Sequence, residues 1–372
     1  MSEFYTAGPL KLKLSGTHEI IHFLKEEFSD CTTDACIDIE IIINENKKTE
    51  YKPTHYSGKG SMNFNADTFH VDNGSFYFYE VENAFNDKLM TVNICLKKPT
   101  FAREVFRFLK SLLSVEYNSK SAYIKGGIAS YSLLWSVIAL CLLKKDNSFI
   151  HAGVLARKNK AIVLSGTGGC GKTSTVLRLL SYEGFQYLAE DFGIVGSQGV
   201  AYPCMKAVSL YHSDVLHGDP AAISGVKALN PFKRLRWELL SKMLRINPII
   251  KVKPSSLTKL ALPSDSVPVK YGVHLSRQDI GSFKLRKISV EEYAQRSASA
   301  SGRELKPISE ILKLIVANSP KEYLVWSDED LMNKLKNVYE HAFSKAVTYE
   351  LAVPYRSGPK DICDFLLDKL NI

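Results

Sequence analysis

The stretch Ala161-Ile-Val-Leu-Ser-Gly-Thr-Gly-Gly-Cys-Gly-Lys-Thr-Ser174 decides how the rest of the chain is interpreted. Residues 166–173 match the phosphate-binding loop pattern Gly-x-x-x-x-Gly-Lys-Thr. An apolar β-branched run, 162–164, precedes the loop, and apolar residues at helical spacing follow it at 176–180. This order of strand, loop and helix is the context that the pattern requires, and it predicts a site for nucleotide phosphates.

Each residue type in this loop suits such a site. Glycines let the backbone curl so that N–H groups point at phosphate oxygens, and the helix N-terminus adds a partial positive charge. Lys172 would reach the β- and γ-phosphates, and the Thr173 hydroxyl would hold Mg²⁺. The alternative is an ordinary glycine-rich turn. The predicted contact residues are Gly166, Thr167, Gly168, Gly169, Cys170, Gly171, Lys172, Thr173 and Ser174.

Length and composition are those of a globular protein with more than one domain. The chain has 372 residues, of which 45% are apolar and 23% charged, enough for two or three domains with adequate cores. The N-terminus has no basic region followed by an apolar core, so we expect no signal peptide. The longest apolar run, 128–143, is short for a membrane span and is interrupted by serines, so we expect no transmembrane segment.

Cysteine usage and net charge indicate the compartment and the partners. The seven cysteines are scattered and include no Cys-x-x-Cys pair, which favours reduced thiols in the cytoplasm over disulfides or a zinc site. Cys170, inside the loop, is interpreted as a small filler residue, with a redox switch as the alternative. The formal net charge of +9 favours anionic partners.

Residues 1–98 are predicted to form a separate, smaller N-terminal α/β domain. Apolar residues in 20–28 recur at helical spacing, and Asp72-Asn73-Gly74 indicates the turn of a hairpin. This domain carries no chemical motif, and its boundary is placed near Pro99. Strands are predicted from alternating or β-rich patterns at 10–14, 37–43, 69–71, 76–79 and 90–96.

Residues 99–372 are predicted to form the second domain, an α/β fold with a mixed sheet. Within it, 227–259 is a basic insertion, with nine Lys and Arg residues against the single acid Glu238. We expect it to cover the mouth of the site or to dock an anionic partner, with a solvated surface helix as the alternative. The Ser- and Ala-rich stretch 295–302 is predicted to be a mobile loop. The apolar face predicted for the basic helix comprises Phe232, Leu235, Leu239, Met243 and Ile246.

A second motif, Glu190-Asp191, follows Lys172 by only eighteen residues. Two adjacent carboxylates near a triphosphate can divide their work, one holding or orienting Mg²⁺ and the other accepting the proton of an attacking hydroxyl. The alternative is an acidic turn that faces solvent.

Three segments together resemble a known family. They are Phe149-Ile-His-Ala-Gly-Val-Leu155, the loop itself, and Gly184-Phe-Gln-Tyr-Leu-Ala-Glu-Asp191. This combination resembles the HPr kinase/phosphorylase-like group, which is related in fold to ATP-dependent phosphoenolpyruvate carboxykinase, and the resemblance covers residues 151–203. It implies an HPr kinase-like P-loop domain that uses ATP and Mg²⁺ to phosphorylate a serine hydroxyl or a small hydroxyl compound.

The resemblance also implies roles for single residues. Glu190 takes the place of the general base, and Asp191 that of the Mg²⁺-linked carboxylate. His151 matches the active-site histidine, with a hydrogen-bonded core histidine as the alternative, and Lys206 stands where an arginine contacts the acceptor.

The chain departs from this family in three ways. Its first acid is Glu rather than Asp. The C-terminal signature of the HPr kinase that phosphorylates a carrier protein is missing, and the N-terminal domain does not resemble the one in that kinase. We therefore expect a related kinase with another acceptor, and a homo-oligomer is left open. The competing hypotheses are a non-catalytic or regulatory ATP-binding protein and a carboxykinase-like enzyme.

Overall fold

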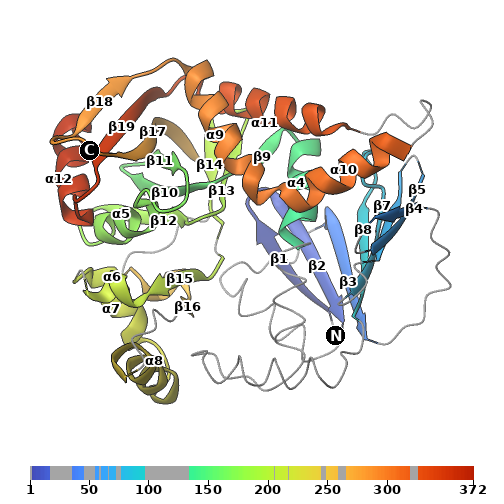
Figure 1. The fold of residues 1–372 in the computed structure, drawn as a ribbon, viewed down its shortest axis with the longest axis horizontal. Helices are drawn as coiled ribbons and strands as arrows, with labels where there is room; N and C mark the ends of the chain where they lie inside the picture. Colours follow the sequence, from blue (N-terminus) through green and yellow to red (C-terminus); the bar gives the residue numbers. More distant parts are fainter. Residues whose placement is uncertain are drawn as a thin grey trace. The chain divides into compact units, whose positions relative to one another are not determined.

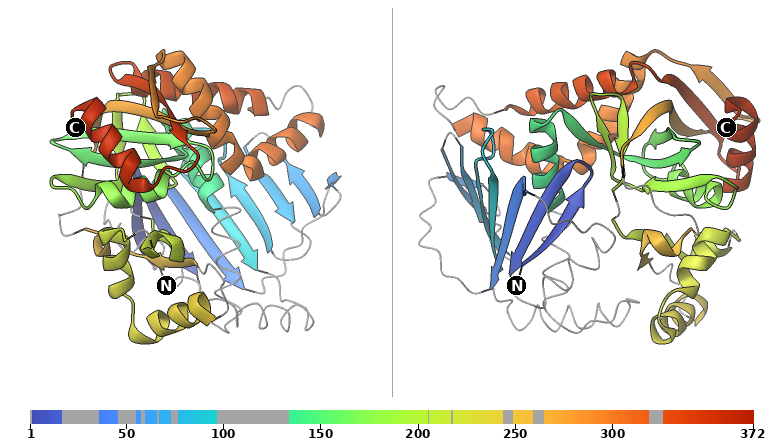
Figure 2. Two further views of the ribbon diagram at one scale, coloured as in Figure 1. Left: turned by 60° about the vertical axis from the view of Figure 1, so that its left-hand side comes forward. Right: turned by 180° about the vertical axis from the view of Figure 1, so that it is seen from behind.

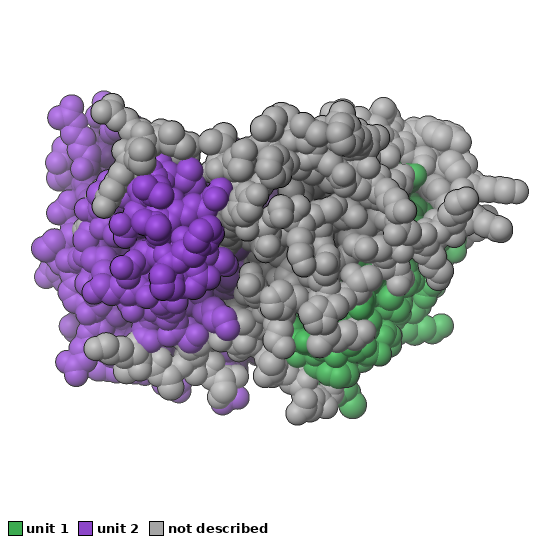
Figure 3. All heavy atoms as spheres, turned by 90° about the horizontal axis from the view of Figure 1, so that it is seen from below, with its two compact units in different colours: residues 1–112, 117–145, 305–334 green, residues 113–116, 146–304, 335–372 purple. Residues whose placement is uncertain are grey.

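The structure is a computed structural model in which the chain divides into two compact units (Figure 3). Unit 1 comprises Met1–Leu112, Tyr117–Lys145 and Leu305–Lys334, and unit 2 the remainder. The predicted boundary near Pro99 lies outside the described residues, and 305–334 group with unit 1 although we had placed them in the second domain. The structure describes residues 2–16, 36–45, 55–57, 60–65, 67–72, 77–96, 134–204, 206–216, 218–243, 249–258, 265–318 and 326–372.

Unit 1 is built on one eight-stranded sheet (Figure 1). The strands follow the order β1-β2-β3-β8-β7-β6-β5-β4, and β3 is parallel to both of its neighbours. Alternate side chains of 10–14 and 39–43 are fully buried, as a strand with one covered face requires. The strands are β1 (Ser2–Ala7), β2 (Leu10–Gly16), β3 (Ile39–Glu45), β4 (His55–Ser57), β5 (Gly60–Phe64), β6 (Phe69–Asp72), β7 (Tyr77–Glu82) and β8 (Met90–Leu96).

Several of these strands match those predicted for the N-terminal segment. β6 pairs with β7 antiparallel, which is the predicted hairpin, and β8 has the predicted bounds. The predicted helix at 20–28 lies outside the described residues. The described helices of this unit are α4 (Trp135–Lys144), α10 (Lys306–Asn318) and the first turns of α11 (Asp328–Phe343).

Unit 2 is built on a nine-stranded mixed sheet, as predicted for the domain with the phosphate loop. The strands follow the order β12-β10-β11-β17-β14-β13-β9, and β19 pairs with both β17 and β18. β11, β17 and β19 are parallel, whereas β10 is antiparallel to both β11 and β12. The strands are β9 (Asn147–Ile150), β10 (Ala152–Arg157), β11 (Lys160–Gly166), β12 (Phe185–Ala189), β13 (Gly193–Gly196), β14 (Val200–Tyr202), β17 (Val267–Gln278), β18 (Lys284–Lys287) and β19 (Val347–Pro354).

Helices pack on both faces of this sheet (Figures 1 and 2). α5 (Lys172–Leu179) and α12 (Pro359–Leu370) pack together on one face, and α9 (Val290–Glu304) packs on the other. Glycines permit the close approach on each side. A Cβ at Gly153 would lie 2.3 Å from a methyl carbon of Val176, and one at Gly272 would lie 2.9 Å from the rings of Tyr293 and Phe343.

The prediction of a mobile loop at 295–302 is wrong, because this stretch lies inside α9. Its small side chains let the helix approach the sheet, and Ala294, Ala298 and Ser297 are buried. Ser297 Oγ donates to Ser165 Oγ of β11 over 3.1 Å, so the serine hydroxyls are satisfied inside the core. The Ser/Ala composition reflects close packing rather than mobility.

The predicted basic insertion, 227–259, is part of a longer segment that begins after β14 with β15 and ends before β17. β15 and β16 pair antiparallel in a separate two-stranded sheet. On α8, Phe232 and Leu235 of the predicted apolar face are 66% and 57% exposed, whereas Trp237 and Leu240 are buried. The helix therefore packs through a different face, and Ile246 lies outside the described residues. The elements are β15 (Val208–Tyr211), α6 (His212–Leu216), α7 (Pro220–Lys227), α8 (Pro231–Met243), β16 (Ile249–Val252) and η2 (Pro254–Ser256).

Among the described residues, no helix has the length and apolarity needed to cross a membrane. Cys170, which was interpreted as a filler, is a free and buried thiol in the phosphate loop.

Candidate functional site

The topology of unit 2 gathers the predicted site residues at one edge of the sheet. β12 is antiparallel to β10, which is antiparallel to β11, so β12 runs in the same direction as β11, β17 and β19. The carboxyl ends of these four strands therefore lie at one edge, and β10 begins there. Glu190-Asp191 follow β12, the phosphate loop follows β11, and His151 directly precedes β10. In open α/β sheets, ligands bind outside the carboxyl ends of the strands.

The phosphate loop has the backbone conformation that its glycines predict. Gly166, Gly169 and Gly171 have φ of 142°, 79° and 100°, values that favour glycine. A Cβ at Gly166 would also lie 2.4 Å from the carbonyl oxygen of Leu275 on β17. At Gly168 and Gly169, by contrast, a Cβ would meet no heavy atom within 4 Å, so this side of the loop faces open space.

Lys172 points back over the loop and is buried. Its Nζ donates to the carbonyl oxygens of Gly166 and Thr167, over 2.8 and 3.0 Å, and lies 3.0 Å from Nε2 of His151. The lysine ammonium can only donate hydrogen bonds, so Nε2 of His151 accepts one from it and the ring proton lies on Nδ1. The structure thus brings the predicted lysine and the predicted histidine into direct contact.

His151 connects this lysine to the acid pair. Its Nδ1 lies 3.2 Å from Oδ1 of Asp191, and its backbone N–H donates to Ser301 Oγ of α9 over 3.0 Å. Glu304, also on α9, lies at 3.9 Å from the same Nδ1. The ring is therefore held between a cation and carboxylates, which is an arrangement for orienting charged groups rather than for filling a core.

The two adjacent carboxylates point to different partners. Asp191 has φ of 67°, and the N–H of Phe192 donates to the carbonyl oxygen of Glu190 over 2.8 Å, so the chain turns sharply here. Glu190 accepts a hydrogen bond from the Thr173 hydroxyl. Asp191 faces His151 and Lys206, whose Nζ lies 3.8 Å from its Oδ2.

The surroundings move the pKa values of this pair in opposite directions. Burial, and then the negative charge of Asp191, raise the pKa of Glu190 to about 7, although the Thr173 hydroxyl opposes the change. Burial also acts to raise the pKa of Asp191, but the adjacent His151 ring and the charge of Lys206 outweigh it and hold that pKa below its usual value. Asp191 is therefore ionised at neutral pH, whereas Glu190 is partly protonated at that pH.

Lys206, which the resemblance placed at the acceptor, lies beside the acid pair. Besides its approach to Asp191, its ammonium stands over the ring of Phe192, 4.3 Å from the centroid. Its side chain is buried, so the charge is held in place by these two neighbours.

Sequence reasoning missed Asp214, which supports the loop from the segment between β14 and β17. Ser174 donates to Oδ1 of Asp214 over 3.1 Å, and the N–H of Tyr211 donates to Oδ2 over 2.9 Å. Asp214 is buried and lies forty residues beyond Ser174 on α6. No local pattern marks this residue, since only the fold brings α6 to the start of α5.

The oxygen atoms around Thr173 fit a magnesium ion. Thr173 and Glu190 present a hydroxyl and a carboxylate side by side, which are hard donors that Mg²⁺ prefers. Within the described residues, no group of three or more His, Cys, Asp or Glu side chains could hold a metal by itself. Mg²⁺ commonly binds through one or two protein groups together with substrate phosphates, so this donor set suits a metal that arrives with a nucleotide.

No protein-family model matches the chain, and no curated protein matches it. The resemblance to the HPr kinase-like group therefore stays a prediction, and it depends on the loop, His151 and the acid pair.

Proposed function

We propose that the chain is an ATP- and Mg²⁺-dependent kinase that transfers the γ-phosphoryl group to an alcohol, either a serine hydroxyl or a small hydroxyl compound. The observation that carries the proposal is the contact chain at one sheet edge, from Lys172 through His151 to Asp191. A glycine-rich loop for phosphates alone would be compatible with many functions. A loop lysine joined to an ionised carboxylate and a second basic residue, Lys206, is suited to transfer.

The geometry favours a division of roles opposite to the one that the resemblance implied. Thr173 and Glu190 would hold Mg²⁺, which would neutralise phosphate charge in the transfer. The negative charge of Asp191 makes ionisation of Glu190 unfavourable, and a cation bound at Glu190 would offset this repulsion. Asp191 would accept the proton of the acceptor hydroxyl, with His151 and Lys206 as its positioning residues.

The proposed reaction is a single in-line displacement. The hydroxyl oxygen of the acceptor forms a bond to the γ-phosphorus, and the bond from that phosphorus to the β,γ-bridging oxygen breaks. ADP leaves with that electron pair, and the hydroxyl proton moves to Asp191. Lys172 stabilises the charge on the phosphates, and most of the rate comes from positioning and charge neutralisation.

The test is transfer from γ-labelled ATP to a pool of serine peptides and hydroxyl metabolites. Asp191→Asn should reduce transfer about 10²- to 10⁴-fold with ATP affinity nearly unchanged. Glu190→Gln should instead raise the Mg²⁺ concentration needed for half-maximal transfer. Exchanged phenotypes would restore the role assignment from the resemblance.

The competing function is an ATP-binding protein without transfer activity. It would be favoured if ATP binds tightly, no acceptor is labelled, and neither acid substitution has an effect. The acceptor, a cytoplasmic location and the oligomeric state remain predictions that the same preparation can test by product identification, fractionation and light scattering.

A further inference from the structure

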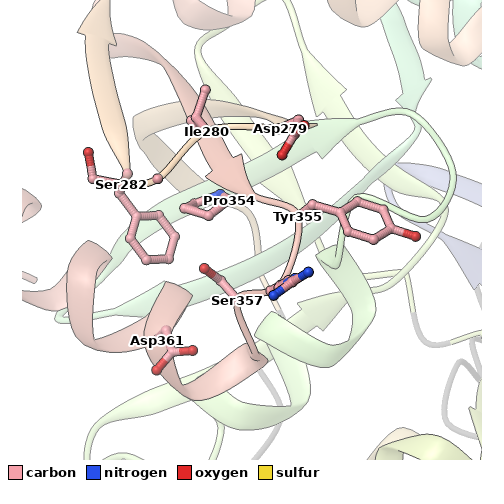
Figure 4. Close-up of a pocket in the computed structure, with 10 residues that line it drawn as sticks. Asp279, Ile280, Ser282, Pro354, Tyr355, Ser357 and Asp361 are labelled. Carbon is pink, nitrogen blue, oxygen red and sulfur yellow. The ribbon is translucent and has the colours of Figure 1, made fainter.

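A pocket of about 930 Å³ lies at the sheet edge next to the phosphate loop. It is formed by the loops that follow β17 and β19 and by the start of α12 (Figure 4). Its size is that of a site for a small organic ligand. The lining residues are Asp279, Ile280, Gly281, Ser282, Phe283, Pro354, Tyr355, Arg356, Ser357 and Asp361.

The walls of this pocket combine flat apolar surfaces with polar groups. Phe283 stacks on Phe365 of α12, with centroids 4.9 Å apart and an angle of 21°, which fixes its ring. Tyr355 is 72% exposed, so its ring is available for contact with a ligand. Figure 4 shows Pro354 between Ser282 and Tyr355 in this view. Rings with hydroxyl and carboxylate groups nearby suit a flat heterocycle that is joined to a sugar.

Arg277 forms a wall between this pocket and the phosphate loop. Its guanidinium donates to the carbonyl oxygens of Tyr355 and Ser357, over 2.6 and 3.0 Å. On its other side, the same guanidinium lies 3.4 Å from the position that a Cβ of Gly171 would occupy. Ile362 of α12 lies equally close to that position. Arg277 therefore lies next to both the pocket-lining residues Tyr355 and Ser357 and the loop.

The order of the strands in the sheet determines which way a nucleotide would lie across their carboxyl ends. The acid pair follows β12, on one side of β11, and the pocket lies at the ends of β17 and β19, on the other side. In the proposed function, the γ-phosphate must face the acid pair. The nucleoside must then extend in the opposite direction, which is toward the pocket.

We infer that this pocket binds the base and ribose of the nucleoside triphosphate whose phosphates the loop binds, and that the acceptor enters from the side of β12. This inference rests on the proposed function. The base would contact the rings of Tyr355 and Phe283. The carboxylate of Asp279 would accept hydrogen bonds from sugar hydroxyls, as carboxylates do in other nucleotide sites.

Calorimetric titration with ATP and with inorganic tripolyphosphate, both with Mg²⁺, separates nucleoside binding from phosphate binding. Tyr355→Ala removes a wall, and Gly281→Trp adds a ring where a Cβ meets no heavy atom within 4 Å, so both variants should fold. Tyr355→Ala should weaken ATP binding about tenfold, the loss expected for one stacking contact, and Gly281→Trp should weaken it by filling the space that the base would occupy. Tripolyphosphate affinity should stay within about twofold of wild type. Lys284→Ala, outside the pocket, is the matched control and should change neither affinity.

Two results would overturn the inference while leaving the proposed function intact. The first is wild-type ATP affinity in both pocket variants, which would place the nucleoside elsewhere. The second is an equal loss for ATP and tripolyphosphate, which would mean that the pocket acts only through the shape of the loop. Failure of the unmodified chain to bind either compound would overturn the proposed function, and this inference with it.

Discussion

Replacing Glu190 by Gln should raise the free energy of unfolding above pH 7 and leave it nearly unchanged near pH 4. Burial beside Asp191 raises the pKa of Glu190 from 4.5 to about 7. The stability that the protonated Glu190 contributes is therefore fully present below pH 4.5 and is lost as the pH rises through 7. Gln keeps the size of the side chain and the acceptor oxygen for Thr173 but never ionises.

The size of this effect follows from the shift. Each pKa unit corresponds to about 1.4 kcal/mol, so the full shift sets an upper limit of about 3 kcal/mol. Glu190 is only half-buried, and solvent screening reduces the value to about 1–2 kcal/mol. A change of this size raises the melting temperature by about 2–8 °C for a domain of this size.

Urea unfolding of wild type and variant between pH 4 and 9 measures the difference directly. Asp191→Asn is the control, because the pKa of Asp191 is lowered and its ionised form stabilises the fold. That variant should lose stability above the usual pKa of an aspartate, the opposite sign to Glu190→Gln. A stability difference for Glu190→Gln that does not change with pH would refute this reasoning.

Three further predictions concern other parts of unit 2. Lys172→Ala should abolish ATP binding in titrations while circular dichroism stays that of wild type, and normal turnover would rule out the phosphate loop assignment. Gly153→Ala should cost about 1–3 kcal/mol in chemical denaturation because of the contact with Val176, and combining it with Val176→Ala should cost at least about 1 kcal/mol less than the sum of the two single changes. Reversing three basic residues of α8 to Glu should weaken acceptor binding and its salt dependence, and unchanged kinetics at low salt would contradict a docking role. These residues are Lys233, Arg234 and Arg236.

The sequence predicted the elements whose pattern is local. Alternation along 37–43 and 90–96 corresponds to β3 and β8, because a strand with one buried face must repeat every two residues. The strand and helix around the phosphate loop were predicted for a similar reason, since the glycines and Lys172 follow one another in the chain. The positive φ angles at Gly166 and Gly171 are consistent with that pattern.

Features that depend on distant packing could not be predicted in this way. The Ser- and Ala-rich composition of helix α9 is typical of a loop, and nothing in the local sequence reveals that the helix packs closely on β11. On α8 the apolar residues form two faces, and only the fold decides that Trp237 is buried and Phe232 exposed. Asp214 supports Ser174 from forty residues away. In each case the partner lies far along the chain.

At Asp191 the left-handed backbone conformation favours residues other than the aspartate that the proposed chemistry requires. A non-glycine residue with φ of 67° carries a conformational cost, which glycine would remove and asparagine would reduce. A search for stabilised variants below the usual pKa of an aspartate, where the carboxylate no longer stabilises the fold, should therefore recover glycine or asparagine at 191, and each would lack the carboxylate. A form of this protein selected at such a pH for folding alone would lose, through this single turn, the carboxylate that the proposed transfer requires.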